Sequence, residues 1–135
     1  MPREVGLLIK LLTFDLSSNS LNGSIPGSMG NRHRLYYFNL SCNSLSQKIP
    51  DGLSKLNQLS ELDLSSNFFT RGIPSAFGNL QILEMLNLSH DNLSGLIPKG
   101  LEDPPGSLLI DISFNNLEGP VPKGMAFANI TVEQL

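Results

Sequence analysis

The sequence predicts an α/β solenoid in which each turn of 24 residues contributes one short parallel β-strand. Two observations lead to this prediction, and both are repeats with the same spacing. Prolines recur at this interval, and so do aliphatic residues: Pro26, Pro50, Pro74, Pro98 and Pro122, with Leu16, Leu40, Leu64, Leu88 and Ile112. A fixed period between about 20 and 50 residues is typical of stacked repeat proteins. Such proteins work through the surface that the stack creates, so the functional question is where a partner binds.

The bulk composition argues against several classes of protein. A net charge of −3 and scattered Lys and Arg residues provide no basic stripe for nucleic acid. Cys42 is the only cysteine, so neither a disulfide within the chain nor a cysteine metal cluster can form. No run approaches the roughly 18 apolar residues of a membrane span. We therefore expect a folded domain with no cofactor, no metal and no span of its own.

The strand of each turn is predicted from a Leu-x-Leu step. In Phe14-Asp15-Leu16 and Leu62-Asp63-Leu64, apolar and polar residues alternate with the period of two that a half-buried strand requires. Each strand is too short to be stable by itself. It must pair with the same strand of the next turn, so consecutive strands run parallel.

The rest of each turn returns the chain on the other side. Gly23, Gly95 and Gly119 fit a bend just before the apolar-proline pair of their turns. Proline lacks an N–H and suits an edge or a turn. In the segment after it, such as 75–81, apolar residues lie three apart, which indicates a short helical or 3₁₀ turn.

A row of asparagines predicts how the tight bend after each strand is held. An Asn side chain both donates and accepts hydrogen bonds, so a stacked row can satisfy backbone groups of the bend. We therefore interpret the row as structural. It consists of Asn19, Asn43, Asn67 and Asn115.

Three departures from the repeat are expected to matter. Asp91 takes the fourth asparagine position, and an unsatisfied buried partner there costs about 1–3 kcal/mol, so we predict a weak point unless Asn92 substitutes. Arg32 replaces a leucine, and its stem is expected to cover apolar surface while its head reaches water. Pro104 and Pro105 exclude a regular helix from the outer side of their turn.

The motif Asn-x-Leu-x-Gly-x-Ile-Pro carries a family resemblance. Residues 19–26 read Asn-Ser-Leu-Asn-Gly-Ser-Ile-Pro, and residues 115–122 read Asn-Asn-Leu-Glu-Gly-Pro-Val-Pro. With the 24-residue period, this pattern resembles the plant-type leucine-rich repeat, and the second segment is similar to the last repeat of plant receptor-like kinase ectodomains. The resemblance covers Val5 to about Thr131. It implies a curved, right-handed leucine-rich-repeat solenoid with short helical or 3₁₀ turns on the convex side.

The resemblance also implies a location and a domain division. Such ectodomains lie on the extracellular face of the plasma membrane and bind a peptide, a steroid or another receptor's ectodomain. Residues 1–10 are then the end of a truncated preceding repeat, and 131–135 the start of a missing C-terminal cap. We expect a fragment of a longer protein, whose open ends favour poor solubility or end-to-end association. The five predicted repeats are residues 11–34, 35–58, 59–82, 83–106 and 107–130.

Side chains that point outward from the strands form the candidate binding surface on the concave face. The Ser and Asp/Asn rows recur in every turn and are interpreted as structural, so the variable positions are better candidates for recognition. Five residues form a mixed patch of the sort that interfaces favour: Tyr37, Glu61, Met85, His90 and Phe68. The alternative is a merely solvated face. Five strands about 4.8 Å apart span on the order of 20 Å, which about six residues of extended peptide would cross.

Glycosylation is predicted at one position. The sequons at Asn22, Asn39, Asn87 and Asn92 fall inside the repeat spelling, so the consensus explains them. Asn129 lies beyond the last full motif and is the more credible glycan site.

The sequence offers no catalytic constellation. His33 and His90 lie more than two turns apart, and the serines belong to the repeat. The favoured function is recognition of a peptide or protein ligand, with a co-receptor ectodomain as a further partner and no nucleic acid. The alternative is a secreted inhibitor that resembles the plant polygalacturonase inhibitors. An ice-binding solenoid would need a flat, regular Thr- or Asn-rich face, and the variable positions are too mixed for one.

Overall fold

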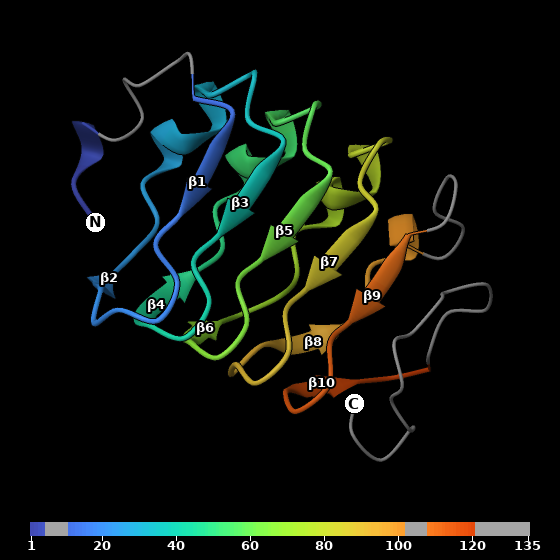
Figure 1. The fold of residues 1–135 in the computed structure, drawn as a ribbon. Coiled ribbons are helices and arrows are strands. Elements are labelled where there is room, and N and C mark those ends of the chain that lie inside the picture. The colour runs from blue at the N-terminus through green and yellow to red at the C-terminus, as the bar shows by residue number, and fades with distance from the viewer. Residues whose placement is uncertain (5–10, 102–107, 121–135) are drawn as a thin grey trace.

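A computed structural model describes residues 1–4, 11–101 and 108–120, which form a stack of similar turns (Figure 1). One side of the stack is a parallel sheet whose strands follow one another in chain order. Each strand residue faces its equivalent in the next turn, as Thr13 faces Tyr37. The strands are β1 (Thr13–Asp15), β3 (Tyr37–Asn39), β5 (Glu61–Asp63), β7 (Met85–Asn87) and β9 (Leu109–Asp111).

A second set of short parallel strands follows the asparagine bends, along the lower edge of the molecule in Figure 1. It forms one three-stranded sheet and one two-stranded sheet. The first consists of β2 (Asn22–Gly23), β4 (Ser44–Lys48) and β6 (Phe68–Thr70), and the second of β8 (Ser94–Leu96) and β10 (Asn116–Glu118).

In the first four turns the outer segment contains a 3₁₀ helix. The sequence left open whether this segment is α-helical or 3₁₀. The structure has short 3₁₀ helices there, each beginning directly after a proline. The Pro26 carbonyl, for example, accepts a hydrogen bond from the Met29 N–H at 3.0 Å. The helices are η2 (Gly27–Asn31), η3 (Asp51–Lys55), η4 (Ser75–Asn79) and η5 (Lys99–Leu101).

The bend before the prolines has a left-handed backbone. Gly23, Gly95 and Gly119 have φ angles of 79°, 80° and 82°, as their predicted place in the bend requires. Gln47 and Arg71 occupy the same position in the second and third turns, with φ angles of 69° and 65°. Sequence analysis did not single out these two residues.

The core is a continuous column of apolar side chains inside the stack. The middle strand residues Phe38, Leu62, Leu86 and Ile110 are all 0% exposed. At the first turn, Phe14 packs edge-on against Phe38, with ring centroids 5.6 Å apart. Each turn therefore stabilises its neighbours through direct contact.

The asparagine side chains of the row make hydrogen bonds to the backbone of the bends. Asn67 Nδ2 donates to the carbonyl oxygens of Leu40, Leu64 and Ser65 at 3.0–3.2 Å. Its Oδ1 accepts the backbone N–H of Leu45 at 3.0 Å. One side chain thus satisfies groups in two adjacent turns. The same set of bonds recurs at Asn43 and Asn115, and Asn19 donates to two carbonyls of its own turn.

Two expectations about the departures from the repeat are wrong. Arg32 does not reach water, because it lies 0% exposed in the position of the leucines that it replaces. Burial lowers the pKa of its guanidinium. Asn92 does not substitute for the missing asparagine, because it is exposed and its side-chain carbonyl accepts a hydrogen bond from Asn116 Nδ2.

Several sequence predictions lie outside the described residues. They concern the prolines Pro104 and Pro105, the sequon at Asn129 and the segments 5–10 and 131–135. They remain predictions.

Candidate binding surface

The first outward residues of the five strands form a single column across the sheet. Tyr37 lies opposite Glu61, and Glu61 lies opposite Met85, so the register joins three of the five predicted binding residues. Thr13 and Leu109 extend the column at its two ends. This column is chemically mixed, as a recognition surface requires.

The second column alternates strictly between Asp and Asn. Its side chains make hydrogen bonds to the residues that directly follow each strand, here called the strand exits. Asp63 Oδ1 accepts the Ser65 N–H at 3.0 Å and the Ser65 hydroxyl at 2.6 Å. Asn87 Oδ1 makes the same two bonds to Ser89. These residues therefore have a structural role, as predicted, and in addition they set the charge of the face. The column is Asp15, Asn39, Asp63, Asn87 and Asp111.

The two columns are linked at their N-terminal end by Tyr37. Its hydroxyl donates to Asp15 Oδ2 at 3.4 Å and accepts from Asn39 Nδ2 at 3.1 Å. Hydrogen bonds from the Ser17 side chain and backbone hold the pKa of the Asp15 carboxyl below its ordinary value, and the Tyr37 bond adds to this. Asp15 is therefore charged at neutral and mildly acidic pH.

His90 belongs to a third column, just beyond the strand exits. All five residues of this column have a left-handed backbone, with φ angles of 55–56°. The backbone is fixed by the ladder, since the His90 N–H donates to the Ser113 carbonyl at 3.0 Å. The side chains are therefore free to vary without disturbing the stack. The column is Ser18, Cys42, Ser66, His90 and Phe114.

The C-terminal end of the face contains two exposed apolar residues that the predicted patch omitted. Phe114 is 49% exposed and stacks on His90, with ring centroids 4.3 Å apart and planes 14° apart. Leu109 is also 49% exposed and lies opposite Met85. Both occupy the same repeat positions as predicted residues, and that periodicity was the signal that could have included them.

Phe68 is exposed, but the main sheet does not include it. It lies on β6, in the three-stranded sheet, with 61% of its surface exposed. Its partner across the ladder is Ser46. Four of the predicted residues therefore belong to the strand face and its exits, and Phe68 to the neighbouring edge.

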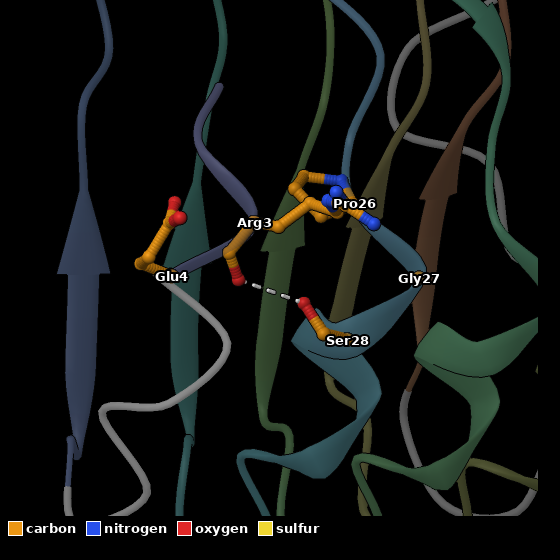
Figure 2. Close-up of a pocket in the computed structure, with 5 residues that line it drawn as sticks. All are labelled: Arg3, Glu4, Pro26, Gly27 and Ser28. Atoms are coloured by element: carbon orange, nitrogen blue, oxygen red, sulfur yellow. Dashed lines mark hydrogen bonds between the residues drawn. The ribbon is translucent and has the colours of Figure 1, made fainter.

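Two hollows lie away from the strand face. One has a volume of about 390 Å³ and is lined by Arg3, Glu4, Pro26, Gly27 and Ser28; Figure 2 shows how these five residues lie. The Ser28 hydroxyl donates to the Arg3 carbonyl at 3.1 Å, which ties the chain start to η2. A second hollow of about 410 Å³ is lined by Ser24, Ile25, Gly27, Gln47, Lys48 and Pro50. Neither is lined by a residue of the three columns.

Within the described parts of the chain, no group of three or more His, Cys, Asp and Glu side chains is placed to hold a metal ion. No helix there has the length and apolar character needed to cross a membrane. The candidate site is thus an open surface built of strand and strand-exit side chains.

Comparison with known proteins identifies the repeat. A family model described as leucine rich repeat matches residues 9–69 and 58–117. Among solved structures, the chain is similar to the ectodomain of the plant membrane receptor kinase GASSHO1/SCHENGEN3 from Arabidopsis thaliana, in complex with CASPARIAN STRIP INTEGRITY FACTOR 2. The identity is 44% and the TM-score 0.85, over 88% of this chain and 14% of that one.

Two further structures are similar over most of the chain. The Arabidopsis receptor kinase HAESA, in complex with the peptide hormone IDA and the co-receptor SERK1, is 30% identical over 99% of this chain and 24% of that one, with a TM-score of 0.85. A plant ice-binding protein is 34% identical over 90% and 39% respectively, with a TM-score of 0.86. The chain therefore spans much less than two thirds of these relatives. A search of curated protein sequences finds no match.

Proposed function

Because the chain belongs to the leucine-rich repeat family, we propose that it is a recognition module from the ectodomain of a plant cell-surface receptor-like kinase. In this proposal it binds a peptide or protein through the strand face. The leucine-rich repeat is a non-catalytic fold. The similar structures are the GASSHO1/SCHENGEN3 ectodomain in complex with CASPARIAN STRIP INTEGRITY FACTOR 2 and HAESA in complex with a peptide hormone and a co-receptor. A co-receptor ectodomain is a second proposed partner.

The observation that supports this function most is the continuous ladder of chemically varied side chains. Tyr37, Glu61 and Met85 follow one another in register on a fixed backbone, half-buried at their bases. A rigid scaffold with variable residues at fixed spacing provides a preorganised binding surface. Asn39 and Asn87, which belong to sequons, lie on the same face. The side-chain oxygen of each accepts a hydrogen bond from the N–H of the serine two residues later, just after the strand.

The proposal is tested by binding assays with a matched pair of variants. Purified chain is screened against a panel of secreted peptides and receptor ectodomains. Glu61→Arg with Met85→Ser changes the strand face, and Lys55→Glu changes an exposed residue at the end of η3. We expect the face variant to lose binding and the Lys55→Glu variant to keep it. Binding that the face variant retains would place the binding surface elsewhere.

The receptor assignment is separable from the binding surface. Sequencing the locus beyond Leu135 distinguishes it from a secreted inhibitor of the polygalacturonase-inhibitor type. A membrane span and kinase downstream support the receptor, and a cysteine cap followed by a stop supports the inhibitor.

The similarity to a plant ice-binding protein makes ice binding a second candidate function. The strand face argues against it, because Tyr37, Glu61, Met85 and Leu109 differ in size and charge along one column. An ice recrystallisation assay on the purified chain decides this. Inhibition of recrystal growth that survives Glu61→Arg with Met85→Ser would assign that activity to a different face.

A further inference from the structure

The charge of the strand face is of one sign. Among the fifteen positions of the three columns, the acidic residues are Asp15, Glu61, Asp63 and Asp111, and none is Lys or Arg. Asp63 and Asp111 each accept two hydrogen bonds from a neighbouring serine through Oδ1, which fixes the carboxylate without neutralising it. An acidic face attracts basic segments and repels acidic ones.

The last two turns add apolar side chains on both sides of the Asp/Asn column. Met85 and Leu109 lie on one side, at the strand starts. The stacked rings of His90 and Phe114 lie on the other, beyond the strand exits. The exposed fractions of 49% at Leu109 and Phe114 leave substantial apolar area for a partner to cover.

We propose that the strand face binds an extended basic peptide with two adjacent apolar residues and a Lys or Arg two or three residues away. This inference rests on the proposed function and specifies its ligand class. Successive side chains of an extended peptide point to opposite sides. An adjacent apolar pair that lies along the Asp/Asn column therefore contacts Met85 and Leu109 with one side chain, and His90 and Phe114 with the other.

The spacing of the strands sets the position of the basic residue. Neighbouring strands are about 4.8 Å apart, so β5 lies roughly 7 Å from the midpoint between β7 and β9. An extended peptide covers this in two or three residues of about 3.3 Å each. The basic side chain then reaches Glu61 and Asp63, which occupy the same strand, β5.

The repeat itself supplies variants that change charge without changing the bend. Asn39 and Asn87 make the same Oδ1 bond to a serine N–H that Asp63 makes. Asp63→Asn therefore removes one charge and Asn87→Asp adds one, each with the strand exit intact. Phe114→Asn removes the ring and keeps a residue that tolerates the left-handed φ of 56°.

The experiment selects peptides from a displayed library of random octapeptides, with the full 135-residue chain as bait. We expect enriched peptides to contain Lys or Arg two or three residues from an apolar pair. Synthetic copies of the enriched peptides, and copies with the basic residue changed to glutamate, serve as probes in titrations. For the basic probe, Asp63→Asn weakens and Asn87→Asp strengthens binding by about two- to fivefold, as exposed ion pairs do. Phe114→Asn weakens it by about fivefold or more.

Each outcome separates this inference from the function on which it rests. Enriched peptides without the basic and apolar pattern would overturn the ligand class and leave peptide recognition standing. Tight probes whose affinity is the same in Asp63→Asn, Asn87→Asp and wild type would also overturn it. A selection that enriches no peptide at all, with the chain shown to be folded by circular dichroism, would overturn peptide recognition as well.

Discussion

At the scale of single residues, Asp91 shows what the asparagine row requires. Its Oδ1 accepts the Phe69 N–H at 3.0 Å, as the asparagines do one turn apart. Its Oδ2 is buried and has no hydrogen-bond partner among the described residues. At the equivalent position one turn earlier, Asn67 Nδ2 donates to three carbonyls. The register of the row makes Leu64, Leu88 and Ser89 the corresponding carbonyls for Asp91, and an ionised carboxylate cannot donate to them. The residue type alone led us to predict a weak point at this position, and the unpartnered Oδ2 is consistent with that prediction.

Burial raises the pKa of Asp91 to about 7, which makes stability depend on pH. Hydrogen bonds from the Phe69 and Asn67 backbones oppose the rise, and the charge of Asp63 adds to it. In the unfolded chain the carboxyl has its ordinary pKa of 3.8. Between these values the folded state binds the proton more tightly, so the free energy of unfolding falls as pH rises from about 4 to about 7.

We predict that Asp91→Asn stabilises the protein, and more so at higher pH. Nδ2 of the new asparagine can donate where Oδ2 cannot. After allowance for solvent screening of a partly exposed group, we expect a gain of about 1–2 kcal/mol above pH 7. Thermal melts of both proteins between pH 4 and pH 8 measure the difference. A difference in Tm that is zero, or independent of pH, would contradict the prediction.

The reciprocal variant is the control for this effect. Asn67→Asp places a carboxylate against the Leu40, Leu64 and Ser65 carbonyls. We expect a loss of about 1–3 kcal/mol at neutral pH that becomes smaller as the pH is lowered toward 4. Identical pH profiles for this variant and wild type would show that the row tolerates a carboxylate.

Arg32 shows where residue-level reasoning fails. Its charge suggested a head in water, but its position in the repeat is an inward one, and the structure buries it completely. The neighbouring turns define the inside of the stack regardless of residue type. The stack of His90 on Phe114 was missed for a related reason. The stack depends on the left-handed backbone of His90 and Phe114, which lie one turn apart. The residue type at neither position indicates that conformation.

At the scale of the elements, the bend before each proline carries the next prediction. Gln47 and Arg71 adopt φ angles of 69° and 65°, a region that costs a residue with a Cβ about 1–2 kcal/mol. We expect Gln47→Gly and Arg71→Gly each to stabilise by roughly 0.5–1 kcal/mol, since the greater freedom of glycine in the unfolded chain offsets part of the relief. Urea denaturation measures the change. Gly95→Ala, at the same bend with φ 80°, is expected to destabilise.

The 3₁₀ helices make close contacts that the sequence pattern did not reveal. A Cβ at Gly78 would lie 2.6 Å from the Gly100 carbonyl oxygen of the next turn, which is backbone and cannot yield easily. We predict that Gly78→Ala destabilises by about 1–3 kcal/mol, as overpacking does. Gly27→Ala is the matched control, because its Cβ would meet nothing within 4 Å. Equal denaturation midpoints for the two variants would contradict this account.

At the scale of the whole molecule, periodicity predicted the fold and left the binding surface less determined. The 24-residue spacing is enough to predict the parallel strands, the inward leucines and the asparagine bends. The reason is that equivalent residues of successive turns occupy equivalent positions and make the same contacts. The residues proposed to contact a ligand are those that vary from turn to turn. Their arrangement depends on which side chains meet across turns, as Leu109 meets Met85. Single-column periodicity therefore predicts candidate positions but not a contiguous patch.

The stacked arrangement also predicts how far the destabilising effect of a core mutation extends along the molecule. Each turn contacts only its neighbours, so stability is approximately a sum of turn and interface terms. Phe38, 0% exposed and packed edge-on against Phe14, belongs to the interface between the first two turns. We predict that Phe38→Ala costs about 3–5 kcal/mol and that Phe14→Ala, at a half-buried site, costs less.

Hydrogen exchange followed by mass spectrometry locates the effect of Phe38→Ala. Because the lost contacts lie in the first turns, we expect faster exchange in peptides that cover β1 and β3. Peptides that cover β7 and β9, which do not pair with β3 in the sheet, should exchange nearly as in wild type. A uniform increase across all five strands would mean that the solenoid opens only as one cooperative unit. In that case Asp91 would set the pH dependence of the whole stack and not of its own turn alone.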